Sequence, residues 1–143
     1  MLKVIDPLLG PDLLYILRAM GHGDELAIVD ANYPAYSAGP EVVRIEADAV
    51  RTLDAILTLY PLDTFVPDAC WRMQVVGREN QEEPIFAEFR SVIAKREGPQ
   101  FKLAELERFA LYDRVKQGFA IVKTSERRLY GNVILKKGIV RPD

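Results

Sequence analysis

The stretch Leu26-Ala27-Ile28-Val29 constrains the fold more than any other part of the chain, because it is continuously apolar and ends at Asp30. A strand with one solvated face alternates apolar and polar residues, whereas a strand covered on both faces is apolar throughout. The stretch therefore predicts a central strand buried on both faces, which is typical of a largely parallel sheet with helices on each side.

Helical and strand patterns alternate along the rest of the chain. Apolar residues at helical spacing, bounded by proline or glycine, predict helices over residues 11–20, 49–60 and 84–97, and a helical turn over 112–116. Strands are expected over residues 42–45, 63–66, 71–76, 119–122 and 133–135. The segment 103–109 fits a strand or a helix. This alternation predicts an α/β fold, with residues 1–143 forming a single three-layer α/β/α domain around a largely parallel central sheet.

The composition is that of a globular protein and excludes several partners. Of the 143 residues, 49% are hydrophobic and 28% charged, and the net charge is -2 with basic residues spread along the chain. No basic patch marks a nucleic-acid surface, and no run approaches the roughly 18 apolar residues of a membrane span. Asp6 and Pro7 interrupt the apolar N-terminus before a signal-peptide core can form. We therefore expect no nucleic-acid partner and no membrane, and a cytoplasmic location.

Metal and cofactor chemistry find no support in the sequence. The single cysteine, Cys70, cannot form an internal disulfide, and one cysteine with one histidine falls short of a zinc site. No glycine-rich phosphate loop or Ser/His/Asp signature is present. We expect no cofactor, no metal and a reducing compartment.

The only histidine, His22, lies between Gly21 and Gly23, where a predicted helix ends and the central strand is about to begin. Flanking glycines expose the ring in a flexible turn, and an imidazole is the side chain best suited to give and take a proton near neutral pH. His22 is therefore a candidate acid-base group. The alternative is that His22 is a loop histidine with no functional role.

Asp30 follows the central strand, at the edge of an α/β sheet where ligands bind. Its carboxylate has two possible tasks there, to orient the imidazole or to accept hydrogen bonds from ligand hydroxyls. An Asx turn before Asn32-Tyr33-Pro34 is the alternative.

Further polar candidates lie in the C-terminal half. Tyr130-Gly131-Asn132 combines a phenol, a permissive backbone and an amide, a set that suits a sugar, although a tight turn accounts for it equally well. Arg108 and Tyr112 are suited to line a polar pocket, or Arg108 forms an ordinary surface pair with Glu107.

Four motifs taken in order resemble the mutarotase family that contains L-fucose mutarotase and D-ribose pyranase, nearly end to end. They are Gly21-His22-Gly23-Asp24, Asp30-Ala31-Asn32-Tyr33-Pro34, Glu107-Arg108-Phe109-Ala110-Leu111-Tyr112 and the segment from Tyr130-Gly131-Asn132 to Gly138. The resemblance implies an isomerase with His22 as the proton donor. The residues that it implies for the sugar site are Asp30, Asp63, Met73, Arg108, Tyr112, Tyr130, Gly131 and Asn132.

The resemblance also implies a ring-shaped homo-oligomer, commonly a decamer of two stacked pentamers, with each site shared between neighbouring subunits. Arg108, and the lack of a second histidine before the C-terminal motif, favour the fucose branch. One departure leaves the sugar open: fucose-type members often read Asp-Ala-His-Phe-Pro where this chain has Asp30-Ala31-Asn32-Tyr33-Pro34.

The expected activity is interconversion of the α and β anomers of L-fucose or a related monosaccharide by general acid-base catalysis. The sequence leaves two alternative functions open. One is a sugar-binding or transport-regulating subunit without catalysis, and the other is a structural α/β oligomer in which His22 is incidental.

Overall fold

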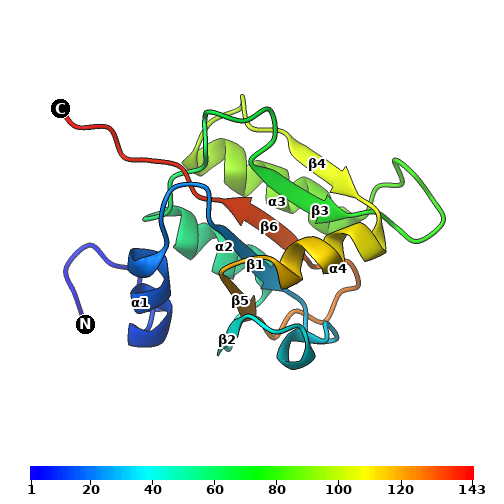
Figure 1. Ribbon diagram of the computed structural model, residues 1–143, viewed down its shortest axis with the longest axis horizontal. Helices are drawn as coiled ribbons and strands as arrows, with labels where there is room; N and C mark the ends of the chain where they lie inside the picture. The colour runs from blue at the N-terminus through cyan, green and yellow to red at the C-terminus, as the bar shows by residue number, and fades with distance from the viewer.

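The computed structural model describes residues 1–143 as a central sheet flanked by helices (Figure 1). The helices are α1 Pro11–Ala19, α2 Ala49–Leu57, α3 Pro84–Arg96 and α4 Arg108–Lys116, with a short 3₁₀ helix η1 Ala35–Ser37. The strands are β1 Glu25–Val29, β2 Glu41–Arg44, β3 Cys70–Met73, β4 Leu103–Leu106, β5 Ala120–Lys123 and β6 Val133–Lys136. None of the helices is both long and apolar enough to cross a membrane.

The six strands form one sheet in the order β2-β5-β1-β6-β3-β4. β1, β2 and β5 pair in parallel, as do β3 and β4, while β6 is antiparallel to both of its neighbours. The five strands other than β6 therefore point the same way, and their ends define a carboxyl edge and an amino edge of the sheet. The predicted largely parallel sheet is confirmed.

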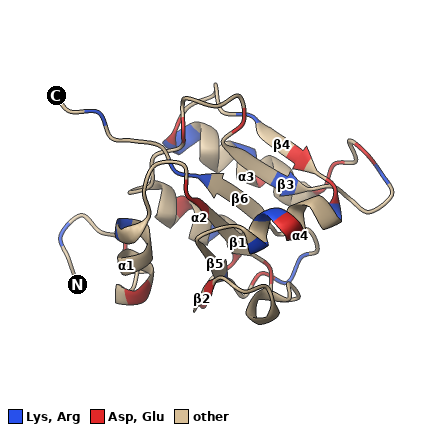
Figure 2. Ribbon diagram, in the orientation of Figure 1, with Lys and Arg blue, Asp and Glu red and all other residues tan.

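Helices cover both faces of the sheet, which confirms the three-layer fold (Figure 1). Leu26 and Ile28 of β1 point into a large core with residues of α1, α2 and α3. Ala27 and Val29 point the other way, into a smaller core that α4 covers through Leu111 and Val115. β1 thus contributes to a hydrophobic core on each face, as its continuous apolar sequence requires. Acidic and basic residues are interspersed over the elements (Figure 2).

Local sequence explains most element boundaries. The side chain of Asp48 caps α2 by accepting a hydrogen bond from the N–H of Arg51, and prolines stand at the first position of α1 and α3. The ambiguous segment 103–109 resolves into both alternatives, because β4 ends at Leu106 and α4 begins at Arg108.

One predicted strand, over residues 63–66, is wrong. The Asp63 carboxylate accepts a hydrogen bond from the N–H of Phe65 two residues on, and this local turn takes the place of a strand. Leu62 forms only an isolated bridge with Lys137.

Candidate active site

His22 lies in a tight turn at the amino edge of the sheet. The N–H of Gly21 donates to the Asp24 carboxylate at 2.7 Å, and the N–H of Gly23 donates to the carbonyl of Lys137, at the end of β6, at 2.8 Å. Gly23 has a φ of 88°, a left-handed conformation that glycine adopts without strain. These bonds hold the backbone on both sides of the imidazole.

Asp63 is the hydrogen-bond partner of His22. Nε2 of the imidazole lies 3.0 Å from Asp63 Oδ1, and the side chains are 44% and 3% exposed respectively. An ionised carboxylate only accepts, so Nε2 of the neutral ring carries the proton and Nδ1 keeps its lone pair. Burial tends to raise the pKa of Asp63, but the hydrogen bonds from Phe65 N–H and His22 outweigh it and lower the pKa below its usual value. The dyad therefore holds an ionised carboxylate against a half-exposed ring.

Asp30 lies at the carboxyl edge, directly after β1. Its Oδ1 accepts hydrogen bonds from the N–H groups of Asn32 and Tyr33 at 2.9 and 3.0 Å, which is the Asx turn of the alternative interpretation. Burial raises the pKa of the Asp30 carboxyl despite these bonds. Asp30 does not contact His22, so the idea that it orients the imidazole is wrong within one chain; Asp63 does so.

Asn132 joins Asp30 across the sheet edge. It precedes β6, and its side-chain oxygen accepts a hydrogen bond from the N–H of Asp30 at 2.9 Å. Because this bond uses the side-chain oxygen, the amide nitrogen of Asn132 remains available as a donor. Two motifs that are 102 residues apart in sequence meet here because β1 and β6 are antiparallel neighbours.

These residues surround a cavity of about 200 Å³ at the carboxyl edge. Six residues predicted for the sugar site line it: Asp30, Met73, Arg108, Tyr112, Tyr130 and Asn132. Asn32, Tyr33, Val76 and Leu129 complete the lining. Sequence interpretation did not single out Val76 and Leu129, since an exposed aliphatic residue in a loop carries no chemical motif.

The loop before β6 holds Tyr130 in an unusual conformation. Tyr130 has a φ of 63°, which is rare for a residue other than glycine and is often found at functional sites. A Cβ added to Gly131 would lie 2.7 Å from Cγ of Glu126 and 3.3 Å from Cβ of Asp30. Gly131 is therefore required by close packing, and the tight-turn alternative and the cavity are both realised.

Arg108 begins α4 with its guanidinium 4.4 Å above the Phe109 ring. The alternative of a surface pair with Glu107 is not found, because the Glu107 carboxylate caps the helix through the N–H groups of Phe109 and Ala110. Nε of Arg108 is buried without a hydrogen-bond partner. A buried donor without a partner at a cavity wall is suited to a ligand oxygen.

The His22–Asp63 pair and the residues of the cavity lie at opposite edges of the sheet. His22 and Asp63 are at the amino edge, and the cavity is at the carboxyl edge beyond the five residues of β1. At about 3.3 Å per residue, the ends of this strand are roughly 13 Å apart. The structure therefore joins Asp63 to His22, and joins the remaining predicted residues to one another, but it does not bring His22 into the cavity.

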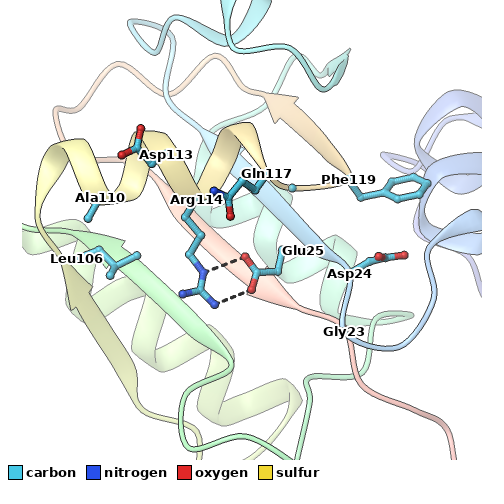
Figure 3. A pocket seen from close by; sticks show the side chains of 10 residues that line it. Gly23, Asp24, Glu25, Leu106, Ala110, Asp113, Arg114, Gln117 and Phe119 are labelled. Atoms are coloured by element: carbon cyan, nitrogen blue, oxygen red, sulfur yellow. Dashed lines mark hydrogen bonds and ion pairs between the residues drawn. The ribbon is translucent and has the colours of Figure 1, made fainter.

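A larger hollow of about 760 Å³ opens next to the His22 turn, between Gly23 and α4 (Figure 3). Arg114, which lines it, binds both carboxylate oxygens of Glu25 at 2.6 and 2.9 Å, and Lys136 lies 3.3 Å from the same carboxylate. Arg114 also stacks 3.7 Å above the Trp71 ring. None of the predicted site residues lines this hollow.

An α/β fold with a cavity of carboxylate, amide, phenol and guanidinium groups is suited to small polyhydroxylated ligands. The chain belongs to the RbsD / FucU transport protein family, whose model matches residues 3–140. It is 41% identical to fucose mutarotase of Homo sapiens over 97% of this chain and 94% of that one, and 44% identical to fucose mutarotase of Danio rerio over 99% and 96%. A solved structure of fucose mutarotase in complex with L-fucose, from Streptococcus pneumoniae, has a TM-score of 0.91 at 39% identity, covering 98% of this chain and all of that one.

Proposed function

We propose that the protein is a monosaccharide mutarotase that interconverts the α and β anomers of L-fucose or a closely related sugar. The observation that carries the proposal is the His22–Asp63 pair, which leaves one imidazole nitrogen free on a half-exposed ring. Acid-base catalysis contributes about 10²- to 10⁴-fold to a rate, which suits a reaction that already proceeds in water. The full-length similarity to fucose mutarotases supports the same activity and sugar class.

The proposed mechanism moves two protons. Nδ1 of His22 takes the proton of the anomeric hydroxyl while the hydroxyl of Tyr130 gives a proton to the ring oxygen, and the bond between C1 and that oxygen breaks. The open aldehyde rotates about the bond between C1 and C2. When the ring closes on the other face, His22 donates its proton to the aldehyde oxygen and the phenolate of Tyr130 takes back the proton of the attacking hydroxyl. Atoms and charge therefore balance over the cycle.

The other residues of the cavity hold the sugar. The free oxygen of Asp30 accepts from a sugar hydroxyl, while the amide nitrogen of Asn132 and Nε of Arg108 donate. Tyr112 and Met73 supply the apolar and aromatic wall. Gly131 lets the loop approach closely, and Asp63 acts on the sugar through His22.

We further propose that each active site is completed by a second copy of the chain. The cavity of about 200 Å³ is smaller than the roughly 300–1,000 Å³ of a typical ligand site, and His22 does not line it. A neighbouring copy that presents its amino edge brings His22 and Asp63 to the cavity, and the hollow beside Gly23 gives room for the two copies to approach.

Exposed aromatic and aliphatic residues at both edges favour such a contact. Phe65 is 61% exposed, and the centroid of its ring lies 5.3 Å from that of the His22 ring. Near the cavity, Phe109 is 59% exposed and Leu129 is 66% exposed. Because the two surfaces differ, the contact is head-to-tail, and such contacts form a ring when the rotation between neighbouring copies closes. We therefore propose a cyclic homo-oligomer, in keeping with the decamer of two stacked pentamers implied by the sequence resemblance.

Saturation-transfer NMR on L-fucose, D-ribose and related sugars tests the activity, because it measures anomer exchange directly and ranks the substrates. We expect faster exchange of L-fucose with the wild-type protein than with His22→Ala at equal concentration. Binding of L-fucose without faster exchange would instead identify a sugar-binding subunit. We also propose a cytoplasmic location, which the single, unpaired cysteine Cys70 supports.

A further inference from the structure

The hydroxyl of Tyr130 is held by a loop on the other side of the cavity. The backbone N–H of Val76 donates to Tyr130 Oη at 3.3 Å, and both residues line the cavity. A phenol that accepts a hydrogen bond from a fixed backbone donor keeps its own O–H for another acceptor. The position of Val76 therefore decides where Tyr130 can deliver its proton.

Val76 lies in a loop, residues 74–83, that connects β3 to α3. The N–H of Arg78 donates to the carbonyl of Val75 at 2.9 Å, which closes a turn around Val76 and Gly77. Gly77 and Asn80 both have positive φ, 74° and 58°. Such a loop keeps one shape only where side chains from outside it hold it in place.

Glu105, in the middle of the edge strand β4, makes that attachment. Its carboxylate accepts hydrogen bonds from Nε2 of Gln74 at 2.9 Å and from the backbone N–H of Asn80 at 3.1 Å. It also pairs with the guanidinium of Arg72 at 2.8 Å. One carboxylate thus binds the start of the loop, its far side and the strand before it.

Arg72 makes this attachment rigid. Its side chain is 4% exposed, the guanidinium carbon lies 4.2 Å above the Phe86 ring, and Nη1 donates to the carbonyl of Met73. A buried cation requires a fixed anionic partner. Glu82 is 3.9 Å from Arg72 and 56% exposed, so Glu105, at 2.8 Å and 21% exposed, is the main partner.

We infer that Glu105 is a positioning residue for proton transfer: it clamps the 74–83 loop, and through the N–H of Val76 it aims the hydroxyl of Tyr130 at the sugar. Glu105 does not line the cavity, so it acts through the loop and not directly on the sugar. The inference rests on the proposed mutarotase function, because it assigns Tyr130 a proton to deliver.

A double-mutant cycle tests the inference. Saturation-transfer NMR gives kcat and KM for exchange of L-fucose by wild type, Glu105→Gln, Tyr130→Phe and the double variant. Glu105→Gln is expected to lower kcat about three- to tenfold, the effect of one misplaced hydrogen bond, with little change in KM. In the Tyr130→Phe background the same substitution is expected to change kcat less than about twofold, because no hydroxyl remains to be aimed.

Two further variants separate positioning from stability. Glu79→Gln, an exposed carboxylate of the same loop, is the matched control and is expected to exchange L-fucose like wild type. Val76→Pro removes the N–H donor without touching the Arg72 and Glu105 charges, and it remains informative if Glu105→Gln fails to fold. The loss of kcat caused by Val76→Pro is also expected to disappear in the Tyr130→Phe background.

Different results overturn the two proposals. The positioning role is overturned if Glu105→Gln and Val76→Pro each lower kcat by the same factor in the wild-type and Tyr130→Phe backgrounds. It is also overturned if both single variants are fully active. If wild type itself shows no faster exchange of L-fucose or any related sugar, the mutarotase function fails and the positioning role fails with it.

Discussion

Nε2 of His22 lies 3.0 Å from Oδ1 of Asp63, across 41 residues of sequence. The carboxylate is held by the backbone, since the N–H of Asp63 donates to the carbonyl of Lys136 and Oδ1 accepts from the N–H of Phe65. A carboxylate anchored in this way fixes both the orientation and the tautomer of the ring, which is the usual task of the third member of a catalytic triad.

Asp63→Asn is expected to suppress anomer exchange while leaving the fold intact. Asparagine can keep an oxygen toward the N–H of Phe65 and the imidazole, but it carries no charge and no longer stabilises the imidazolium that forms when Nδ1 takes a proton. We expect a loss approaching that of His22→Ala, about 10²- to 10⁴-fold in kcat by saturation-transfer NMR. Asp68→Asn, a half-buried carboxylate of the same loop, is the control. Wild-type exchange by Asp63→Asn would refute the dyad.

Mixing two inactive variants is expected to restore activity if sites are shared between copies. His22→Ala has an intact cavity, and Asp30→Asn has an intact His22–Asp63 pair. In a mixed ring with equal amounts of both, about one site in four joins two intact halves. Co-refolding the variants and measuring exchange checks this, with each variant refolded alone as the control. A mixture no more active than its components would place the whole site within one chain.

Gly131→Ala is expected to distort the sugar site. The new Cβ would lie 2.7 Å from Cγ of Glu126, closer than side-chain carbons approach, so the loop that carries Tyr130 and Asn132 must shift. We expect weaker L-fucose binding, by at least about tenfold, together with a lower melting temperature, since strain of this kind costs about 1–3 kcal/mol. Gly10→Ala is the matched control, because no atom lies within 4 Å of its Cβ position. Equal affinity of both variants for L-fucose would show that the loop absorbs the methyl group.

The layers of the fold were predictable because burial leaves a local pattern. The continuous apolar run of β1 and the bounded helical spacing of α2 and α3 each report which faces are covered. β4 was ambiguous for the same reason, since all four residues of this edge strand are half-buried and no alternation develops. A helix then starts two residues after the strand ends.

The division of the site between two edges was not predictable from the residues themselves. It depends on β6 running antiparallel between β1 and β3, which brings Asn132 to Asp30 at one end and Lys137 to Gly23 at the other. Strand order and direction come from long-range packing, which periodicity does not record. The Asp63 partner of His22 depends on the same strand, through the bond to Lys136.

Acid is expected to loosen the sugar site through Glu126, which packs against Gly131. Hydrogen bonds from the Arg128 side chain hold the pKa of this carboxyl below its ordinary value of 4.5. A carboxyl with a lowered folded pKa stabilises the native state above its unfolded pKa, and the stabilisation is lost as the pH falls through the folded pKa.

Thermal melting of wild type and Glu126→Gln between about pH 3 and pH 7 checks this linkage. We expect the variant to be less stable at neutral pH and the two curves to converge as the pH falls through the lowered pKa of Glu126, where the wild-type carboxyl becomes protonated as well. Glu41→Gln, an exposed carboxylate at the start of β2, is expected to follow wild type throughout. Curves for wild type and Glu126→Gln that stay parallel down to the lowest pH would mean that the ionised Glu126 carboxylate does not stabilise the Tyr130 loop.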